Sequence, residues 1–351
     1  MPSIIKIMTL LCASCIFSAA HASCISPVQT ERLSNYCLLE KAKGTSISLQ
    51  TGKLIDYRLK KEGYAQGLGL PGRVRSVTLQ TDIAPVLEYE DNINGGNPNK
   101  PLILGPYEFN GDPALVRKHG VVFGLNASLN GRYTLGAGRY IDYFGGISHS
   151  YSPKYNIWIR RHNAYVCTKN HIKNLWHVDA CAKTSHEKKQ LVESRQNTLS
   201  FSTSKLYKSS GHNFHQISFG VSRIYKVGYT QNQFNVKRQT IHSNGWHSSL
   251  QTVFGARVEN QLATLASLTG VVSIPVNKKN ITVSAGYSNA HGGRLLGIER
   301  TENTWSLSTA FNIHKNILLR VGYEATTSTI SYFNKSSLTF SVIFAPLDFS
   351  Y

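Results

Sequence analysis

The chain has 351 residues, a formal net charge of +19 at pH 7 and a hydrophobic content of 41%. That content is too low for a bundle of membrane-spanning helices, and beyond the N-terminal segment no apolar stretch reaches the roughly 20 residues that such a helix needs. In a cytosolic protein the positive charge would suggest nucleic acid as a partner. The N-terminus indicates export instead, and we therefore expect no nucleic-acid partner.

Residues 1–22 are expected to form a signal peptide. Lys6 is their only charged residue, an apolar run follows it, and Ala20-His21-Ala22 provides the small residues at which signal peptidase cuts. We expect the mature chain to start near Ser23 with a formal charge of +18, since only Lys6 is lost. A retained membrane anchor and a lipoprotein lipidated at Cys24 are the less favoured alternatives.

Four cysteines remain in the exported chain, and they allow three pairings into two disulfides. We favour the local pairing, because it closes two short loops. The pairs are Cys24–Cys37 and Cys167–Cys181. Neither has the tight C-x-x-C spacing of a zinc site, which argues against metal-bound thiols.

Residues 23–76 differ in kind from the rest of the chain. The segment 31–43 is compatible with a short helix, and 63–72 is rich in glycine. The segment is too small to count on as an independent domain. We expect a periplasmic extension, or a plug segment in the mouth of the domain that follows.

Residues 77–351 show the period-two alternation of strands with one apolar and one polar face. In 281–288, for example, Ile, Val, Ala and Tyr alternate with Thr, Ser and Gly. The segments are about ten residues long, the length at which a tilted strand crosses a bilayer. Tyr and Trp recur near the segment ends, as in the aromatic girdles of membrane barrels. The fold class predicted is all-β, an up-and-down antiparallel outer-membrane barrel.

About fourteen strands are expected, with the count between 224 and 261 uncertain by two. They are 78–90, 119–129, 132–141, 155–166, 175–182, 197–206, 212–223, 228–237, 246–257, 263–275, 280–289, 302–312, 317–326 and 336–346. Connections after odd-numbered strands are mostly long, and those after even-numbered strands, such as Asn130-Gly131, are mostly short. Outer-membrane barrels alternate in this way between outer loops and periplasmic turns, so both termini should be periplasmic.

The C-terminus fits the signal that the outer-membrane insertion machinery uses, an aromatic last residue preceded by alternate apolar positions. Leu347, Phe349 and Tyr351 match that pattern. Pro346 is unfavourable inside a strand, so the last regular strand is expected to end before it.

The run Pro85 to Asn94, with Tyr89-Glu90-Asp91-Asn92-Ile93-Asn94 at its end, resembles the opening strand of the C-terminal barrel of the surface lipoprotein assembly modifier family. In that family a Tyr-x-x-Asn-x-Asn-like motif precedes a long first loop. The resemblance implies a barrel of about fourteen strands over residues 77–351. The helical-repeat domain of that family has no counterpart in the short segment 23–76, which puts a role in lipoprotein export in doubt.

We expect no enzymatic activity, no cofactor and no bound metal. In Ile241-His242-Ser243-Asn244-Gly245 the His and Ser are adjacent, and adjacent strand residues point to opposite faces. His171, His177 and His186 lie in one region without a register that would make them ligands, and are interpreted as solvated loop residues.

Charge provides the remaining candidate sites. If Ile317, Leu319, Val321 and Tyr323 face lipid, then Arg320 and Glu324 point into the lumen. A basic region is expected in loops, as ordinary solvated charge or as a dedicated site. Its members are Arg160, Arg161, Lys169, Lys173, Lys183, Lys188, Lys189 and Arg195.

Three functions stay open: a transport barrel that favours anions, a lipoprotein or surface-protein assembly barrel, and a structural surface barrel. The expected partners are outer-membrane lipid, lipopolysaccharide, the insertion machinery, and either a lipoprotein or small anionic solutes. Transport is the function that we favour.

Overall fold

The computed structural model describes residues 24, 30–43, 49–64, 77–98, 101–104, 106–276, 279–314, 317–344 and 347–350, so the expected signal peptide lies outside the described residues. Fourteen antiparallel strands, each paired with its neighbours in the chain, form a barrel that closes where β1 pairs with β16. The predicted all-β, up-and-down barrel and its strand number are confirmed. The strands are β1 (Val77–Glu90), β4 (Gly120–Gly136), β5 (Arg139–Ser152), β6 (Ile157–His171), β7 (Trp176–Lys188), β8 (Glu193–Lys208), β9 (Phe214–Lys226), β10 (Tyr229–Ile241), β11 (His247–Gly255), β12 (Ala263–Val276), β13 (Lys279–Leu295), β14 (Ile298–His314), β15 (Ile317–Ser328) and β16 (Lys335–Phe344).

The barrel seam is made by two consecutive segments of the last strand. β16 pairs with the later part of β1, where Val86 lies opposite Ile343. A short strand, β17 (Leu347–Ser350), then continues along the earlier part of β1, where Ile83 lies opposite Leu347. The regular strand therefore ends before Pro346, as expected, and pairing resumes after it.

One predicted turn is wrong. Asn130 and Gly131 were expected to separate two strands, 119–129 and 132–141, but they lie inside β4 and pair with β1 on one side and β5 on the other. Pairing on both sides outweighs the local turn preference of an Asn-Gly pair. The real turn follows Gly136, where Gly138 adopts a positive φ of 66° that favours glycine.

The predicted alternation of long and short connections is also wrong for most connections beyond the first. The connection 91–119 is long and contains β2 (Leu102–Leu104), β3 (Tyr107–Phe109) and a 3-10 turn, η1 (Pro113–Leu115). Of the further long loops expected, 142–154, 183–196 and 290–301 are largely strand, and the connections there are only 153–156, 189–192 and 296–297. The loop expected at 327–333 is mostly connection, because β15 ends at Ser328. The polar ends of these strands resemble loops in sequence, because they lack the apolar alternation of the strand centres.

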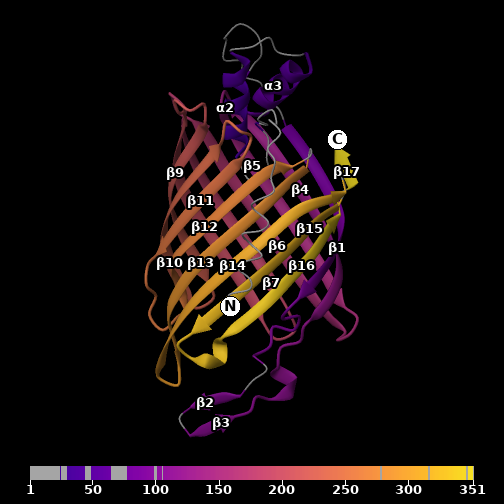
Figure 1. The fold of residues 1–351 in the computed structure, drawn as a ribbon, viewed down its shortest axis with the longest axis vertical. Coiled ribbons are helices and arrows are strands. Elements are labelled where there is room, and N and C mark those ends of the chain that lie inside the picture. The colour runs from indigo at the N-terminus through magenta and orange to yellow at the C-terminus, as the bar shows by residue number, and fades with distance from the viewer. Residues whose placement is uncertain are drawn as a thin grey trace.

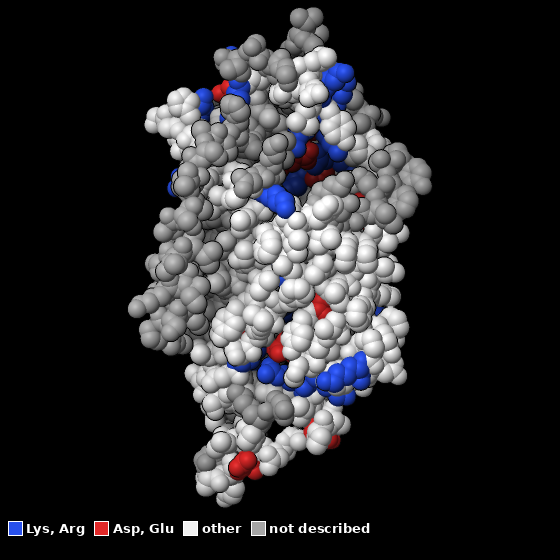
Figure 2. Space-filling view, turned by 45° about the vertical axis from the view of Figure 1, so that its right-hand side comes forward, with Lys and Arg blue, Asp and Glu red and all other residues white. Residues whose placement is uncertain are grey.

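The two faces of the barrel wall differ in chemistry. Large apolar side chains stand exposed on the outer wall at alternate positions, as Phe123, Leu125, Leu199, Phe201 and Trp305 do. On the face shown in Figure 2, Lys and Arg gather toward the two ends, and the described surface between them is mostly uncharged. The inward positions between the apolar residues are largely small or polar.

Two helices, α2 (Glu31–Ala42) and α3 (Leu49–Lys61), lie at the end of the barrel where β1 begins and β17 ends (Figure 1). We call this the plug end, and the opposite end, which carries β2 and β3, the loop end. α2 matches the helix expected at 31–43, whereas α3 was not predicted. No helix among the described residues has the length and apolarity needed to cross a membrane. A second 3-10 turn, η2 (Ser331–Phe333), connects β15 to β16.

Candidate functional site

Helix α2 packs into the mouth of the barrel at the plug end. Its Leu33 and Cys37 are fully buried and form a cluster with inward residues of three strands. The strand residues of this cluster are Leu206, Phe214 and Ile241. The disulfide between Cys24 and Cys37 lies in the same cluster and ties the start of the extension to α2. The described part of the extension is therefore in contact with the inner wall at this end.

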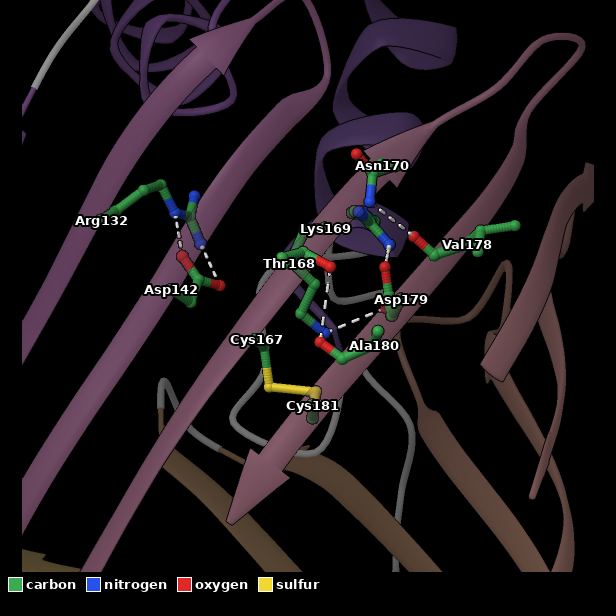
Figure 3. Close-up of a disulfide and its surroundings, with 11 residues drawn as sticks. Arg132, Asp142, Cys167, Thr168, Lys169, Asn170, Val178, Asp179, Ala180 and Cys181 are labelled. Atoms are coloured by element: carbon green, nitrogen blue, oxygen red, sulfur yellow. Dashed lines mark hydrogen bonds and ion pairs between the residues drawn. A yellow bond between two sulfur atoms is a disulfide. The ribbon is translucent and has the colours of Figure 1, made fainter. Parts of the chain in front are cut away.

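Ion pairs fix the same helix to the wall. Arg32 donates to the Asp179 carboxylate at 2.8 Å, and Lys169 lies 3.0 Å from the other oxygen of that carboxylate. Figure 3 shows Lys169 and Asp179 on the neighbouring strands β6 and β7. Both members of the Arg32–Asp179 pair are largely shielded from water, so losing either one leaves a poorly solvated charge.

A second anchor involves Arg132 of β4, which contacts Glu31 of α2 at 2.8 Å and Asp142 of β5 at 2.6 Å. The Arg132–Asp142 pair is visible in Figure 3, and Figure 2 shows basic and acidic side chains together in a hollow near this end. Glu31, Arg132 and Asp142 line a cavity of about 490 Å³.

Glu62, just after α3, is a buried acid within the plug. Desolvation, followed by repulsion from Glu31, raises its pKa to about 7. Its carboxylate accepts a hydrogen bond of 2.8 Å from the Asn35 side chain, which joins α3 to α2. Tyr64, two residues later, hydrogen-bonds His171 of β6 at 3.0 Å. The plug thus contains a titratable group beside its contacts with the wall.

At the loop end the start of the first connection folds back against the wall. Ile93 is fully buried against inward residues of β4 and β6, namely Val122, Ile157 and Ile159. Asn94, also fully buried, accepts from the Lys118 amide at 2.8 Å and donates to the Val116 carbonyl at 2.8 Å. The motif Tyr89–Asn94 of the sequence therefore shapes this mouth of the barrel.

A network of charges lies beside that folded segment. Arg161 reaches three carboxylates, those of Glu88 at 2.7 Å, Glu90 at 2.6 Å and Glu187 at 3.2 Å. Lys189 completes it with a contact of 2.9 Å to Glu90. Three acids against two bases give this network a net negative charge.

Other inward bases have no such partners. In the described part of the chain, no carboxylate lies within ion-pair distance of Arg320, Lys183 or Lys237. Lys237 is instead repelled by the positive charges of Lys183 and Lys169. Arg320 is on the face opposite to the exposed Tyr323, so the strand register places it inward with Glu324. Glu324 pairs with Lys335 of β16 at 2.7 Å.

The basic region was expected in loops, and that expectation is wrong for most of its members. Only Lys173 and Lys189 lie in connections, while the other six are in strands β6, β7 and β8. Strand alternation sorts these six into two groups. Arg161, Lys169 and Lys183 share the inward face, and Arg160, Lys188 and Arg195 share the outward face.

The second disulfide, between Cys167 and Cys181, joins directly opposed residues of β6 and β7 whose Cα atoms are 4.1 Å apart (Figure 3). The favoured local pairing is thus the one that the structure forms. It crosslinks two strands that are already paired.

The histidines do not form a metal site in the described part of the chain. His171 and His177 lie close, with ring centres 5.0 Å apart near the plug end, whereas His186 is toward the loop end of β7. All three are in strands, so their expected place in loops is wrong. His242 bonds Ser248 at 2.9 Å rather than Ser243, a contact that requires the turn between β10 and β11.

No known family model matches the chain, and no curated protein matches it. Among solved structures, one that is similar is Pseudomonas aeruginosa OccK10 (OpdN). It shares 7% sequence identity with this chain, the match covers 78% of this chain and 99% of OccK10, and the TM-score is 0.40. Acinetobacter baumannii OccAB2 has 8% identity over 78% and 98%, at 0.42. The β domain of the Bordetella autotransporter BrkA has 8% identity over 78% and 100%, at 0.31. The resemblance to the assembly modifiers is not confirmed and stays a hypothesis.

Proposed function

We propose that the chain is an outer-membrane barrel of the transport type whose N-terminal helices plug one mouth. The observation that carries this proposal is the combination of an apolar outer wall with a polar lumen into which α2 is packed. A closed barrel satisfies all its backbone hydrogen bonds between strands, which is the requirement for crossing lipid with strands. A soluble barrel would gain nothing from exposing Phe123, Phe201 and Trp305.

The plug end is proposed to face the periplasm. An even number of strands brings the start of β1 and the end of the last strand to one end. The longest connection between the described strands, 91–119, lies at the other end. In bacterial barrels the longer loops are on the outside. The loop end would then be in contact with the outer leaflet.

The lumen is proposed to favour anions. Carboxylates compensate the bases Arg32, Arg132 and Arg161. Among the described residues, no carboxylate does so for Lys183, Lys237 or Arg320. Uncompensated bases in a narrow, weakly screened passage raise the local concentration of anions. Small anionic solutes are therefore the proposed cargo.

Conductance in planar bilayers tests the proposal. The full mature chain should show a small or absent current, and a variant lacking residues 23–76 should show a stable open current. Both should be recovered from the outer-membrane fraction with heat-modifiable gel mobility, since closed barrels resist detergent until heated. Silence from both proteins, in spite of correct assembly, would exclude the pore.

An assembly barrel is the second candidate, and the way the motif Tyr89–Asn94 folds the first connection into the mouth favours it. This alternative predicts that export of a surface lipoprotein depends on the chain and fails when Ile93 and Asn94 are replaced by Ser and Ala. A silent barrel that supports no export would be structural.

A further inference from the structure

We infer that the outer wall of β5 to β8, near the loop end, holds a binding site for a lipid with two phosphates on a disaccharide headgroup, the chemistry of lipid A. The inference rests on the proposed function, because this wall meets lipid only if the barrel spans a membrane. It is carried by a polar patch and an apolar groove that adjoin each other on the same face.

The patch consists of outward side chains of four adjacent strands that can bind an anion. They are His149 of β5, Arg160 and His162 of β6, His186 and Lys188 of β7, and Arg195 of β8. The three histidines follow one another, with ring centres 5.7 Å and 5.9 Å apart. Lys188 and Arg195 are 58% and 67% exposed, so a ligand can reach both of them.

A single acid lies among these groups on the outer face. Glu193 contacts His186 at 3.0 Å, Arg195 at 3.4 Å and Lys188 at 3.9 Å. One carboxylate against three permanent cations leaves an excess of positive charge at the patch. Guanidinium groups bind phosphate through paired hydrogen bonds, so Arg160 and Arg195 suit a phosphorylated headgroup.

The apolar groove begins about four residues farther along β6, β7 and β8, toward the barrel centre, and continues across β9 to β11. It has a volume of about 1050 Å³, and its apolar lining includes Val166, Ala182, Leu199, Phe201, Val221 and Phe234. Arg223 of β9 also lines it. A hollow of this size on an outer wall accommodates acyl chains.

The breadth of the patch distinguishes this lipid from a common phospholipid. From His149 to Arg195 it spans three strand intervals, roughly 14 Å at the usual spacing of neighbouring strands. A single phosphodiester cannot contact both edges of such a patch. A disaccharide that carries a phosphate at each end can.

The test is a titration of the purified full chain in neutral detergent, with bound lipid counted by native mass spectrometry. The probes are bisphosphorylated hexa-acyl lipid A, its monophosphorylated form, phosphatidylglycerol and inorganic phosphate. We expect the first to bind at least tenfold more tightly than the others. The variant R160Q/K188Q/R195Q should lose at least tenfold in that affinity.

A matched control removes three outward cations near the plug end, R139Q/K205Q/R238Q, and should bind like the wild type. Equal binding by wild type and the patch variant would overturn the inference, and so would equal binding of phosphatidylglycerol or full competition by inorganic phosphate. Heat-modifiable mobility is measured in parallel. If it is lost in the wild type, the proposed membrane barrel fails; if it is kept while the patch variant binds normally, only the lipid site fails.

Discussion

Arg32 of α2 and Asp179 of β7 form a buried ion pair of 2.8 Å, and Lys169 shares the same carboxylate. Replacing Asp179 by Asn leaves two bases without a carboxylate, whereas replacing Arg32 by Met leaves Asp179 paired with Lys169. We therefore expect Asp179→Asn to weaken plug docking by about 3–5 kcal/mol and Arg32→Met by less. Hydrogen exchange of the α2 amides measures the difference, and a reversed order of the two variants would contradict it.

Plug docking should depend on pH through Glu62. Its pKa is raised to about 7 in the folded plug, so between pH 4.5 and 7 the docked state binds a proton that the free segment does not. Docking is thus strongest at low pH and weakens as the pH rises through 7, by on the order of 3 kcal/mol in total. Glu62→Gln should remove this dependence and dock more tightly at pH 8. The readout is protection of α2 and α3 against protease at pH 5 to 8.

The protease experiment has an internal control in Asp56 of α3. Asp56 pairs with Lys60 at 3.2 Å within the helix, and its side chain is 21% exposed. Asp56→Asn should leave the pH dependence as in the wild type. A pH dependence that persists in Glu62→Gln would show that another group controls docking.

The two disulfides should act on different transitions although they close loops of similar size, 13 and 14 residues in sequence separation. Each is expected to contribute about 3 kcal/mol by restricting the unfolded chain. Replacing both Cys24 and Cys37 by Ser should increase amide hydrogen exchange in α2. The melting temperature of the barrel should stay unchanged. Removing Cys167–Cys181 should lower the temperature at which gel mobility changes and leave α2 protected. An identical effect of both would contradict this separation.

The sequence predicts the barrel well because alternation reports directly on which residues meet lipid and which meet the lumen. It fails at Asn130-Gly131, where a local turn signal lies in a strand paired on both sides. It also fails at strand ends, because hairpins that extend into water keep their hydrogen bonds without apolar alternation. Arg160 and Arg161 illustrate the consequence, since a pair interpreted as loop charge is divided between the two faces of β6.

Contacts between distant segments were beyond prediction from one sequence. Nothing in the segment around Arg32 indicates that its partner is Asp179, far along the chain. The sequence of helix α3 has no strong N-terminal capping signal. Contacts with α2, such as the hydrogen bond between Asn35 and Glu62, hold the helix in position. In contrast, the inward position of Arg320 was predictable, because its neighbours in β15 alternate regularly.

Arg320 provides the most direct test of the lumen. In the barrel lacking residues 23–76, Arg320→Glu should move the reversal potential, measured in a salt gradient, toward the equilibrium potential of the cation. The reason is that an inward base without a carboxylate partner becomes an acid. Arg160→Glu makes the same change of charge on the outward face, and should leave the reversal potential unchanged. Both variants should keep heat-modifiable mobility.

The alternative placement of Arg320 gives the opposite result. If its side chain met lipid, it would cost about 2–4 kcal/mol near the membrane midplane, and Arg320→Leu would stabilise the barrel. Tyr323 and Leu338 are exposed on the outward face, which places Arg320 on the inward face. With that placement, Arg320→Leu should leave the melting temperature of the barrel nearly unchanged and reduce its preference for anions. A stabilised Arg320→Leu barrel with unaltered selectivity would therefore refute both the register at β15 and the anion-favouring lumen.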